Sequence, residues 1–373
     1  MDSTKFIVDK NDLQKHLQKV CGAVNGKNTL PIYDNILCEL QGEKLTLTGS
    51  DTTIQVETSL NVMQPECDSK FCFDRTVLDT LKTLPSQPIT LEVNANNNSA
   101  SLQHASGDFN FAVLDGEEYK KMAWSEDSGF AMPTDRLKMA LEFNVRQVAY
   151  DELRPVMNGI FVDIEKDKIT FVASDGHRLS KFVDSSIKDV DLKPFNLPKK
   201  AADLLLKYIS SGDNEDAFIS STEKSACVVI GPTTLTARLI EGRYPNYNSV
   251  IPQNNTIKLT ASKKELMSII DRLSIASDSA TGLIKLEAKG EKVLFSSEDR
   301  NYNKSGKEEA EMDCTGDITI GFKGTFMRDL LLALPEDIEI SFSDSNRAML
   351  IVPAEQEDEV TLTMILMPLM LND

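Results

Sequence analysis

The segment from Ser174 to Ser180, Ser-Asp-Gly-His-Arg-Leu-Ser, holds residue types that could carry out hydrolysis. A histidine near an aspartate and a serine hydroxyl is the set from which nucleophilic Ser-His-Asp sites are built. Here Asp175 and His177 are near neighbours in one segment that we expect to be extended, where successive side chains point to opposite faces. We therefore favour a polar turn at this position and keep a hydrolase at His177 as the competing hypothesis.

The Ser-Asp pair of this segment recurs along the chain at a regular distance. Asp51 follows an alternating apolar run that starts at Leu45, and Asp299 follows a less regular run from Val293. Asp51, Asp175 and Asp299 are each 124 residues apart, which is about one third of the 373-residue chain. A repeat of this length indicates three similar units in tandem. Only the middle unit adds Gly-His-Arg-Leu after its Ser-Asp pair.

Each unit reads as two similar halves, each with one helix and several strands. Apolar residues at helical spacing, such as Leu13, Leu17 and Val20, predict amphipathic helices, and runs with period two predict half-buried antiparallel strands. This pattern is typical of the α+β class, with two helices packed on antiparallel sheets in each unit. Polar linkers place the units at residues 1–126, 127–252 and 253–373. The six expected helices are Lys10–Val20, Arg75–Leu84, Asp135–Val148, Lys199–Ile209, Lys263–Leu273 and Thr325–Leu334.

The composition describes an ordinary globular protein, with 41% hydrophobic and 26% charged residues. The chain has no apolar stretch long enough to span a membrane and no secretory leader at its start, so we expect a cytoplasmic protein without a membrane partner. Its six cysteines form no C-x-x-C pair and no zinc-ligand spacing. We therefore expect reduced thiols, no metal site and no cofactor.

Positive charge is concentrated in the six expected helices. Together they hold 15 basic and 8 acidic residues, a net charge of +7, while the chain as a whole carries −18. Helix propensity and solubility alone could favour lysine and arginine there. Because the bias recurs on an acidic background, we favour a helix-lined surface that contacts phosphates without reading bases. A tandem-repeat scaffold that does not bind DNA is the alternative that these helices argue against.

Several motifs, in order and in register with the repeat, resemble one known family. They are Thr29 to Ile32, Leu47 to Asp51, Arg154 with Asn158 and Gly159, Ala173 to Leu179, Arg238 to Tyr247, and Met367 to Leu369. Over its whole length the sequence resembles the bacterial sliding clamps, the processivity (beta) subunits of DNA polymerase III. The resemblance implies a non-catalytic homodimer, joined head to tail, whose six domains close a ring around duplex DNA. It also implies that the replicative polymerase, the clamp loader and repair factors bind through short linear peptides.

The resemblance further implies a hydrophobic groove for those peptides between the central and C-terminal domains. Apolar and methionine side chains suit an extended peptide with one or two apolar anchors. The positions that match the groove of the family are Met157, Ser174, Gly176, His177, Arg178, Leu179, Pro245, Val250, Phe326, Ile365, Met367, Pro368, Leu369 and Met370.

The sequence departs from the family pattern at some of these places. Ser249 stands where an arginine is common, Asn346 where an apolar residue is common, and Met370 where the penultimate arginine is usual. Phe326 replaces a tyrosine and so lacks a hydroxyl donor. We expect these changes to alter fine peptide specificity and to leave the groove itself in place.

DNA contacts and ring closure are carried over from the family in the same way. The resemblance implies phosphate contacts at Lys27, Arg154, Lys199 and Lys200, whereas Pro155 and Val156 stand in place of two tyrosines that touch DNA. For the dimer it implies that Phe109 and Phe111, on an edge strand, meet Leu273 and Ile275 of the second copy, near the acidic run from Glu308 to Glu311. Pairing two open sheet edges across the dimer would also remove an aggregation hazard.

Overall fold

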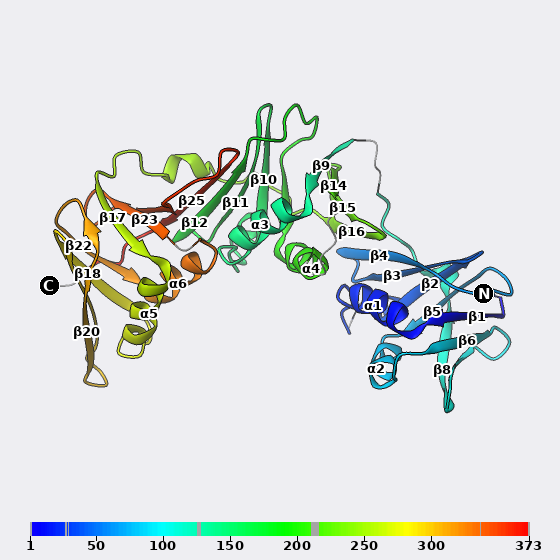
Figure 1. Ribbon diagram of the computed structural model, residues 1–373. Helices are drawn as coiled ribbons and strands as arrows, with labels where there is room; N and C mark the ends of the chain where they lie inside the picture. Colours follow the sequence, from blue (N-terminus) through cyan, green and yellow to red (C-terminus); the bar gives the residue numbers. More distant parts are fainter. Residues whose placement is uncertain are drawn as a thin grey trace. The chain divides into compact units, whose positions relative to one another are not determined.

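The computed structural model describes residues 2–26, 28, 30–124, 128–209, 216–335 and 337–371 (Figure 1). The fold divides into two compact units: one is formed by Met1–Leu137 with Asp203–Leu239, and the other by Lys138–Ala202 with Ile240–Asp373. The central third of the chain therefore contributes to both units. Part of the expected linker, residues 125–127, lies outside the described residues.

The first unit is built on one antiparallel sheet of twelve strands. Strand β4 of the first third pairs with β16 of the central third, with Leu235 opposite Val56, so the sheet continues across the repeat. The strand order is β1(Thr4–Asp9), β6(Pro88–Asn94), β7(Ser99–His104), β8(Gly107–Asp115), β5(Ser69–Asp74), β2(Asn35–Gln41), β3(Lys44–Ser50), β4(Ile54–Asn61), β16(Thr233–Arg238), β15(Ser225–Ile230), β14(Asp216–Ser221) and β9(Gly129–Pro133).

Helix α1(Lys10–Cys21) packs on strands β3 and β4 of this sheet (Figure 1). The carboxylate of Asp9 caps its first turn by accepting hydrogen bonds from the backbone N–H groups of residues 11 and 12. Leu13, Leu17 and Val20 are fully buried, as their helical spacing predicts. The second helix, α2(Thr76–Thr83), packs beside α1 and buries Val77, Leu78 and Leu81.

The second unit contains two antiparallel sheets, and the larger one again joins two thirds of the chain. Strand β12 pairs with β25 along its full length, from Arg178 opposite Leu366 to Asp184 opposite Val360. The larger sheet has the order β13(Phe195–Pro198), β10(Gly159–Glu165), β11(Lys168–Ser174), β12(Arg178–Asp184), β25(Val360–Leu366), β24(Met349–Pro353), β23(Asp337–Phe342), β17(Ile257–Ser262) and β21(Asp313–Cys314). The smaller sheet has the order β20(Lys304–Glu311), β19(Lys292–Asp299), β18(Leu283–Lys289) and β22(Ile318–Lys323).

Helices α5(Lys263–Ser274) and α6(Gly324–Leu332) pack against each other in the second unit (Figure 1). Arg328 Nε of α6 donates to Asp271 Oδ1 of α5 at 2.7 Å, and the apolar faces of both helices are buried. The remaining helices, α3(Thr134–Val145) and α4(Lys199–Ile209), each run from one unit into the other along the chain.

The structure confirms the α+β class and all six expected helices. Helix α3 ends three residues before the expected end at Val148. The alternating runs at residues 45–48 and 169–173 form β3 and β11, and each pairs with its neighbours as an antiparallel strand. Within the described part of the chain, no helix combines the length and apolar character needed to cross a membrane.

Candidate functional site

The Ser174–Ser180 segment contains a tight turn between the end of β11 at Ser174 and the start of β12 at Arg178, which confirms the polar turn expected here. The backbone at Asp175 and His177 is therefore not extended, and the expectation of an extended segment, which spoke against a triad, is wrong. Asp175 Oδ1 accepts hydrogen bonds from the backbone N–H groups of His177 and Arg178, both at 2.9 Å. Gly176 has φ of 90°, a conformation that glycine adopts without a steric penalty. Local carboxylate-to-backbone bonds of this kind reverse the chain.

The polar groups of this turn are engaged in bonds that do not resemble a hydrolytic triad. Ser174 Oγ donates to the carbonyl of Arg178 at 2.8 Å, and Ser180 Oγ donates to Asn144 Oδ1 at 2.7 Å. The second carboxylate oxygen of Asp175 accepts from Arg178 Nε at 2.9 Å. The serines and the aspartate thus have structural partners, and this arrangement supports no Ser-His-Asp chemistry.

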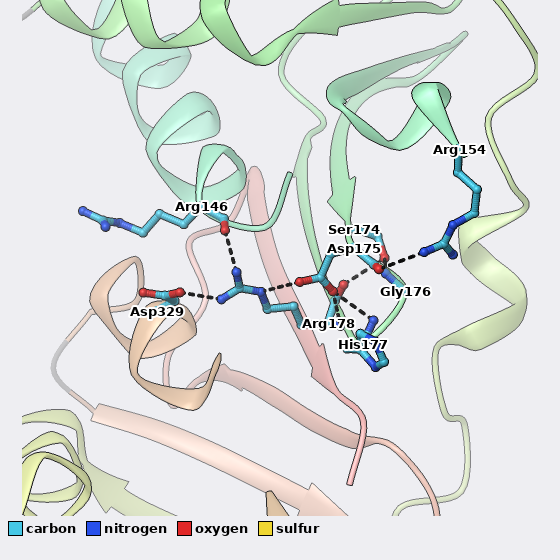
Figure 2. Close-up of polar contacts among 8 residues, drawn as sticks. All are labelled: Arg146, Arg154, Ser174, Asp175, Gly176, His177, Arg178 and Asp329. Atoms are coloured by element: carbon cyan, nitrogen blue, oxygen red, sulfur yellow. Dashed lines mark hydrogen bonds and ion pairs between the residues drawn. The ribbon is translucent and has the colours of Figure 1, made fainter. Parts of the chain in front are cut away.

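Arg178 connects this turn to two other elements (Figure 2). Its Nη1 donates to Asp329 Oδ2 on α6 at 2.7 Å, and its Nη2 donates to the carbonyl of Arg146, just beyond α3, at 3.0 Å. Only 10% of the Arg178 side chain is exposed. Charge-assisted bonds from one planar guanidinium fix three partners in one geometry. Arg178 therefore acts mainly as a positioning residue within the chain.

Two cations lie close to the ring of Phe326 on α6. The guanidinium carbon of Arg178 is 4.5 Å from the ring centroid, and Lys323 Nζ is 4.6 Å from it. The imidazole of His177 lies 6.1 Å from the same ring, centroid to centroid. Cations over an aromatic face hold the ring in place. The half-buried Phe326 thus offers an apolar surface with a positively charged surround.

The end of the chain is hydrogen-bonded to both sides of this region. Strand β25 ends at Leu366; beyond it, Met367 N donates to the carbonyl of His177 at 2.8 Å, and Leu369 N donates to the carbonyl of Gly321 on β22 at 2.8 Å. A Cβ at Gly321 would lie 2.8 Å from the carbonyl oxygen of Leu369, so this approach requires glycine. Pro368 stops the ladder, and the segment leaves Met370 71% exposed.

A buried cluster supports the turn and the chain end from below. It combines Leu179 and Ile365, which pair across β12 and β25, with two tyrosines, Tyr244 and Tyr247. Tyr244 stacks on Phe161 at 4.7 Å between ring centroids, and Tyr247 Oη donates to Asp163 Oδ2 at 2.7 Å. Burial raises the pKa of both phenols, so both stay neutral at physiological pH.

The structure brings together most of the positions expected to form the groove. The Ser174–Leu179 turn, Phe326 and the 365–369 segment are joined by the bonds and ring contacts described above. Pro245 is exposed between the two tyrosines of the cluster, and Val250 is 54% exposed. Met157 is buried, and its backbone N–H donates to the carbonyl of Arg154.

Sequence reasoning missed four residues of this region: Lys323, Asp329, Tyr244 and Tyr247. The two tyrosines lie in the Arg238–Tyr247 motif and could have been found from it. Lys323 and Asp329 reach this region because α6 packs here, and no local sequence pattern predicts their contacts.

The expected phosphate contacts are distributed as follows. Arg154 is exposed and donates to Asp151 Oδ2 at 2.7 Å and to the carbonyl of Asp175 at 3.5 Å. Lys199 and Lys200 begin α4, where Lys199 N donates to the carbonyl of Asn158 at 3.3 Å. Lys27 lies outside the described residues.

Comparison with known proteins gives the family. Models of the DNA polymerase III beta subunit match the chain three times in order: the N-terminal domain at residues 4–123, the central domain at 131–246 and the C-terminal domain at 248–369. The chain belongs to the DNA polymerase III beta subunit family. As a member it is a sliding clamp, a non-catalytic processivity subunit of the replicative polymerase.

Relatives and solved structures agree with this assignment. The beta sliding clamp of Bacillus subtilis is 27% identical, with 96% of this chain and 98% of that protein covered, and that of Haemophilus influenzae is 24% identical, with 98% and 100% covered. The crystal structure of the Bacillus subtilis clamp superposes with a TM-score of 0.91 at 25% identity, covering 100% of both chains. The Pseudomonas aeruginosa clamp bound to griselimycin gives 0.93 at 22% identity, covering 99% and 100%.

The positions expected to close the ring are divided between strand β8 and the end of helix α5. Strand β8 pairs with β7 over residues 107–112 and with β5 only over 113–115, and β20 is the last strand of its sheet. Phe109 on β8 is 42% exposed, and the Phe111 ring packs edge-on against Phe73 at 6.0 Å. Ile275, just after α5, is 75% exposed, whereas Leu273 is buried.

Proposed function

We propose that two copies of this clamp close head to tail into a ring around duplex DNA in the cytoplasm. The ring tethers the replicative polymerase through a peptide groove in the second unit, and the clamp loader and repair factors use the same groove. Each copy supplies three domains, at residues 1–126, 127–252 and 253–373. The matched family models, at 4–123, 131–246 and 248–369, support these boundaries.

The match of three consecutive beta-subunit domains along nearly the whole chain carries this proposal. The charge distribution supports it independently. Helical segments with a net charge of +7, in a chain of net charge −18, attract phosphates, whereas the acidic remainder of the chain repels them. Arg154, Lys199, Lys200 and Lys27 are the proposed phosphate contacts.

We assign the groove to the surface formed by the Ser174–Leu179 turn, Phe326 and the chain end. An incoming peptide packs an apolar side chain against Phe326, Pro368 and Met370, while the cluster that contains Leu179 and Ile365 forms the floor. Met157, Pro245, Val250, Met367 and Leu369 complete the wall. Arg178 holds the wall in place because each of its three guanidinium nitrogens already donates a hydrogen bond within the chain.

Ring closure uses Phe109 and Phe111 of one copy against Ile275 of the other. Leu273 supports Ile275 from inside the fold, since its own side chain is buried. The unpaired edges of β8 and β20 are suited to extend one sheet across the dimer. Glu308 on β20 is already paired with Arg272, whose Nε lies 2.7 Å from Glu308 Oε1, and this pair lowers the pKa of Glu308.

Retention on circular DNA tests the ring. Wild-type protein, loaded onto a nicked plasmid and passed through a sizing column, is expected to elute with the plasmid and to be lost when the plasmid is linearised. Ile275→Asp should weaken the dimer in sedimentation and abolish retention, while Glu355→Ala, an exposed control in the loop between β24 and β25 of the same unit, should not. Equal retention on circular and linear DNA would refute the topological mechanism.

Peptide binding tests the groove. Fluorescence anisotropy with a labelled peptide from the C-terminal tail of the polymerase should show binding to wild type and a loss of at least tenfold for Phe326→Ala and for a chain ending at Leu366. Glu355→Ala is again the control. Unchanged binding by the truncated chain would disprove the groove assignment.

A further inference from the structure

The turn that follows β19 contains a buried aspartate with one unused carboxylate oxygen. Asp299 is only 3% exposed, and its Oδ1 accepts from the backbone N–H groups two and three residues on, at 3.0 and 3.3 Å. The described residues offer no hydrogen bond or ion pair to its Oδ2, whereas the Oδ2 atoms of Asp51 and Asp175 each accept from a side-chain N–H group. A buried carboxylate oxygen without a donor is costly.

Asp299 lacks this donor because of the residue that stands three positions after it. Arg178 follows Asp175 at that distance, but Tyr302 follows Asp299, and Tyr302 is 70% exposed. Asp299 instead lines a pocket of about 500 Å³, a volume within the range of ligand sites. The charged side chains that line the same pocket are Asp278, Asp299, Lys304 and Lys323.

These four side chains, two of each sign, form no ion pair with one another in the described structure. Lys304 on β20 stands directly opposite Asp299 on β19, so their side chains leave the sheet on the same face. Lys304 Nζ nevertheless lies 5.6 Å from the centroid of the Tyr302 ring, and Lys323 Nζ lies 4.6 Å from that of Phe326. The two ammonium groups are therefore placed over aromatic rings and do not neutralise Asp299.

The second carboxylate of the pocket is also only half used. Asp278 Oδ1 accepts from the backbone N–H groups of Ala280 and Thr281 at 3.1 and 2.8 Å. The bonds from Thr281 lower the pKa of Asp278, so the group is ionised at neutral pH. A guanidinium suits two such carboxylates because its planar set of N–H donors can bind more than one acceptor.

We propose that this pocket binds a segment of a partner polypeptide in which an arginine stands next to an acidic residue. The guanidinium donates to Asp299 Oδ2 and to Asp278, and so replaces the donor that Arg178 supplies to Asp175 from within the chain. The acidic side chain accepts from Lys304. This inference depends on neither the proposed ring nor the proposed groove.

The test is a double-mutant cycle between full-length protein and short probes, measured by saturation-transfer NMR. The probes are N-acetyl-Arg-Glu-amide and two analogues, with uncharged citrulline in place of arginine or glutamine in place of glutamate. Asp299→Asn should weaken binding of the Arg-Glu probe at least about tenfold and leave binding of the citrulline probe unchanged. Lys304→Gln should weaken the Arg-Glu probe about twofold and leave the glutamine probe unchanged.

Matched variants keep the test decisive. Asp358→Asn, an exposed aspartate in the loop between β24 and β25, should bind every probe as wild type does. If thermal unfolding shows that Asp299→Asn does not fold, Asp278→Asn takes its place, with the same pattern of losses expected. Equal losses for the arginine and citrulline probes would overturn the inference.

A last comparison separates this pocket from ring closure, because Ile275, a proposed ring contact, also lines the pocket. Binding is therefore measured with Phe109→Asp too, a variant that alters the proposed ring contact in the first unit and leaves the pocket unchanged. Binding of the Arg-Glu probe by Phe109→Asp but not by wild type would support the pocket and show that the second copy covers it. Binding by neither protein would refute the pocket, even if wild type is retained on circular DNA.

Discussion

Two turns of the molecule have the same pattern of local hydrogen bonds but differ in the side chains that bind their aspartates. In the first unit, Ser50 and Asp51 close β3 to β4; in the second, Ser174 and Asp175 close β11 to β12. In both turns the serine Oγ donates to the carbonyl four residues on, at 3.0 and 2.8 Å, and accepts from the N–H two residues on. In both, the aspartate accepts from the N–H groups two and three residues on.

The difference lies at the second carboxylate oxygen. Asp51 Oδ2 accepts from the side-chain amide of Asn25 at 3.0 Å, whereas Asp175 Oδ2 accepts from the guanidinium of Arg178. The guanidinium has further N–H donors, and it uses them on Asp329 and the Arg146 carbonyl (Figure 2). The same turn thus holds a helix and one wall of the proposed groove in the second unit. A repeated structural element gained a specific role through one side chain.

The largest expected effect separates the two aspartates. Asp175→Asn would turn an amide donor toward Arg178 and leave a nearly buried guanidinium with one carboxylate fewer, so we expect a loss of about 2–4 kcal/mol of unfolding free energy. Asp51→Asn replaces the carboxylate that accepts from the neutral amide of Asn25, and should lose about 1–2 kcal/mol. Urea denaturation of both variants measures the difference. Equal losses would mean that Arg178 adds nothing to the turn.

The next effect concerns the residue with positive φ in each turn, Gly176 at 90° and Thr52 at 73°. Gly176→Ala should destabilise by about 1–2 kcal/mol, because alanine disfavours this region and its Cβ would lie 3.1 Å from Arg154 Nη1. Thr52→Gly should be neutral or stabilising by up to about 1 kcal/mol. Thermal unfolding of the two variants should therefore shift in opposite directions. Shifts of the same sign would refute the shared strain.

A pH effect is expected in the first unit. His16 on α1 lies 2.8 Å from Thr58 Oγ1 on β4, and its pKa is lowered to about 4 by burial and by Lys19 and Lys15. Because folding lowers the pKa of His16, the neutral imidazole contributes stability at pH values above the ordinary histidine pKa of about 6.5. This contribution is lost as the pH falls toward 4. Allowing for partial exposure, we expect a loss of about 1–2 kcal/mol between pH 6.5 and 4.

The measurement is hydrogen exchange of α1 and β4 at several pH values. His16→Gln should flatten the pH dependence there, while the backbone of α6 and β12 should respond to neither change. A pH dependence that survives in His16→Gln would assign the effect to other groups.

The smallest effect belongs to the partner of Asp51. Asn25→Ala removes an amide donor from the Asp51 carboxylate and should cost about 1 kcal/mol. Arg178→Lys in the second unit keeps the charge but loses the planar donor set, and should cost more. Urea denaturation of Asn25→Ala and Arg178→Lys measures how much more unfolding free energy the guanidinium contributes than the amide does. A larger loss for Asn25→Ala would reverse the comparison.

Features determined by the sequence itself are those set by near neighbours. The 124-residue spacing, the six helices and the Ser-Asp turns depend on periodicity and on hydrogen bonds that span two to four residues, so local chemistry specifies them. The expected groove is also predictable from local sequence, through the family motifs, because most of its positions lie in two short segments. The domain boundaries and the roles of individual site residues stay predictions.

Only the tertiary structure decided which side chains face inward and which elements join. The peptide contact of Arg178 stays a prediction from the family motif, whereas its bond to Asp329, 151 positions away along the chain, and its burial depend on the packing of α6. Leu273 and Ile275 are both apolar and are both predicted dimer contacts, but helix packing buries the first side chain and exposes the second. Sheets that pair β4 with β16 and β12 with β25 depend on contacts between distant segments. No local pattern encodes such contacts, because they form only when the whole unit packs.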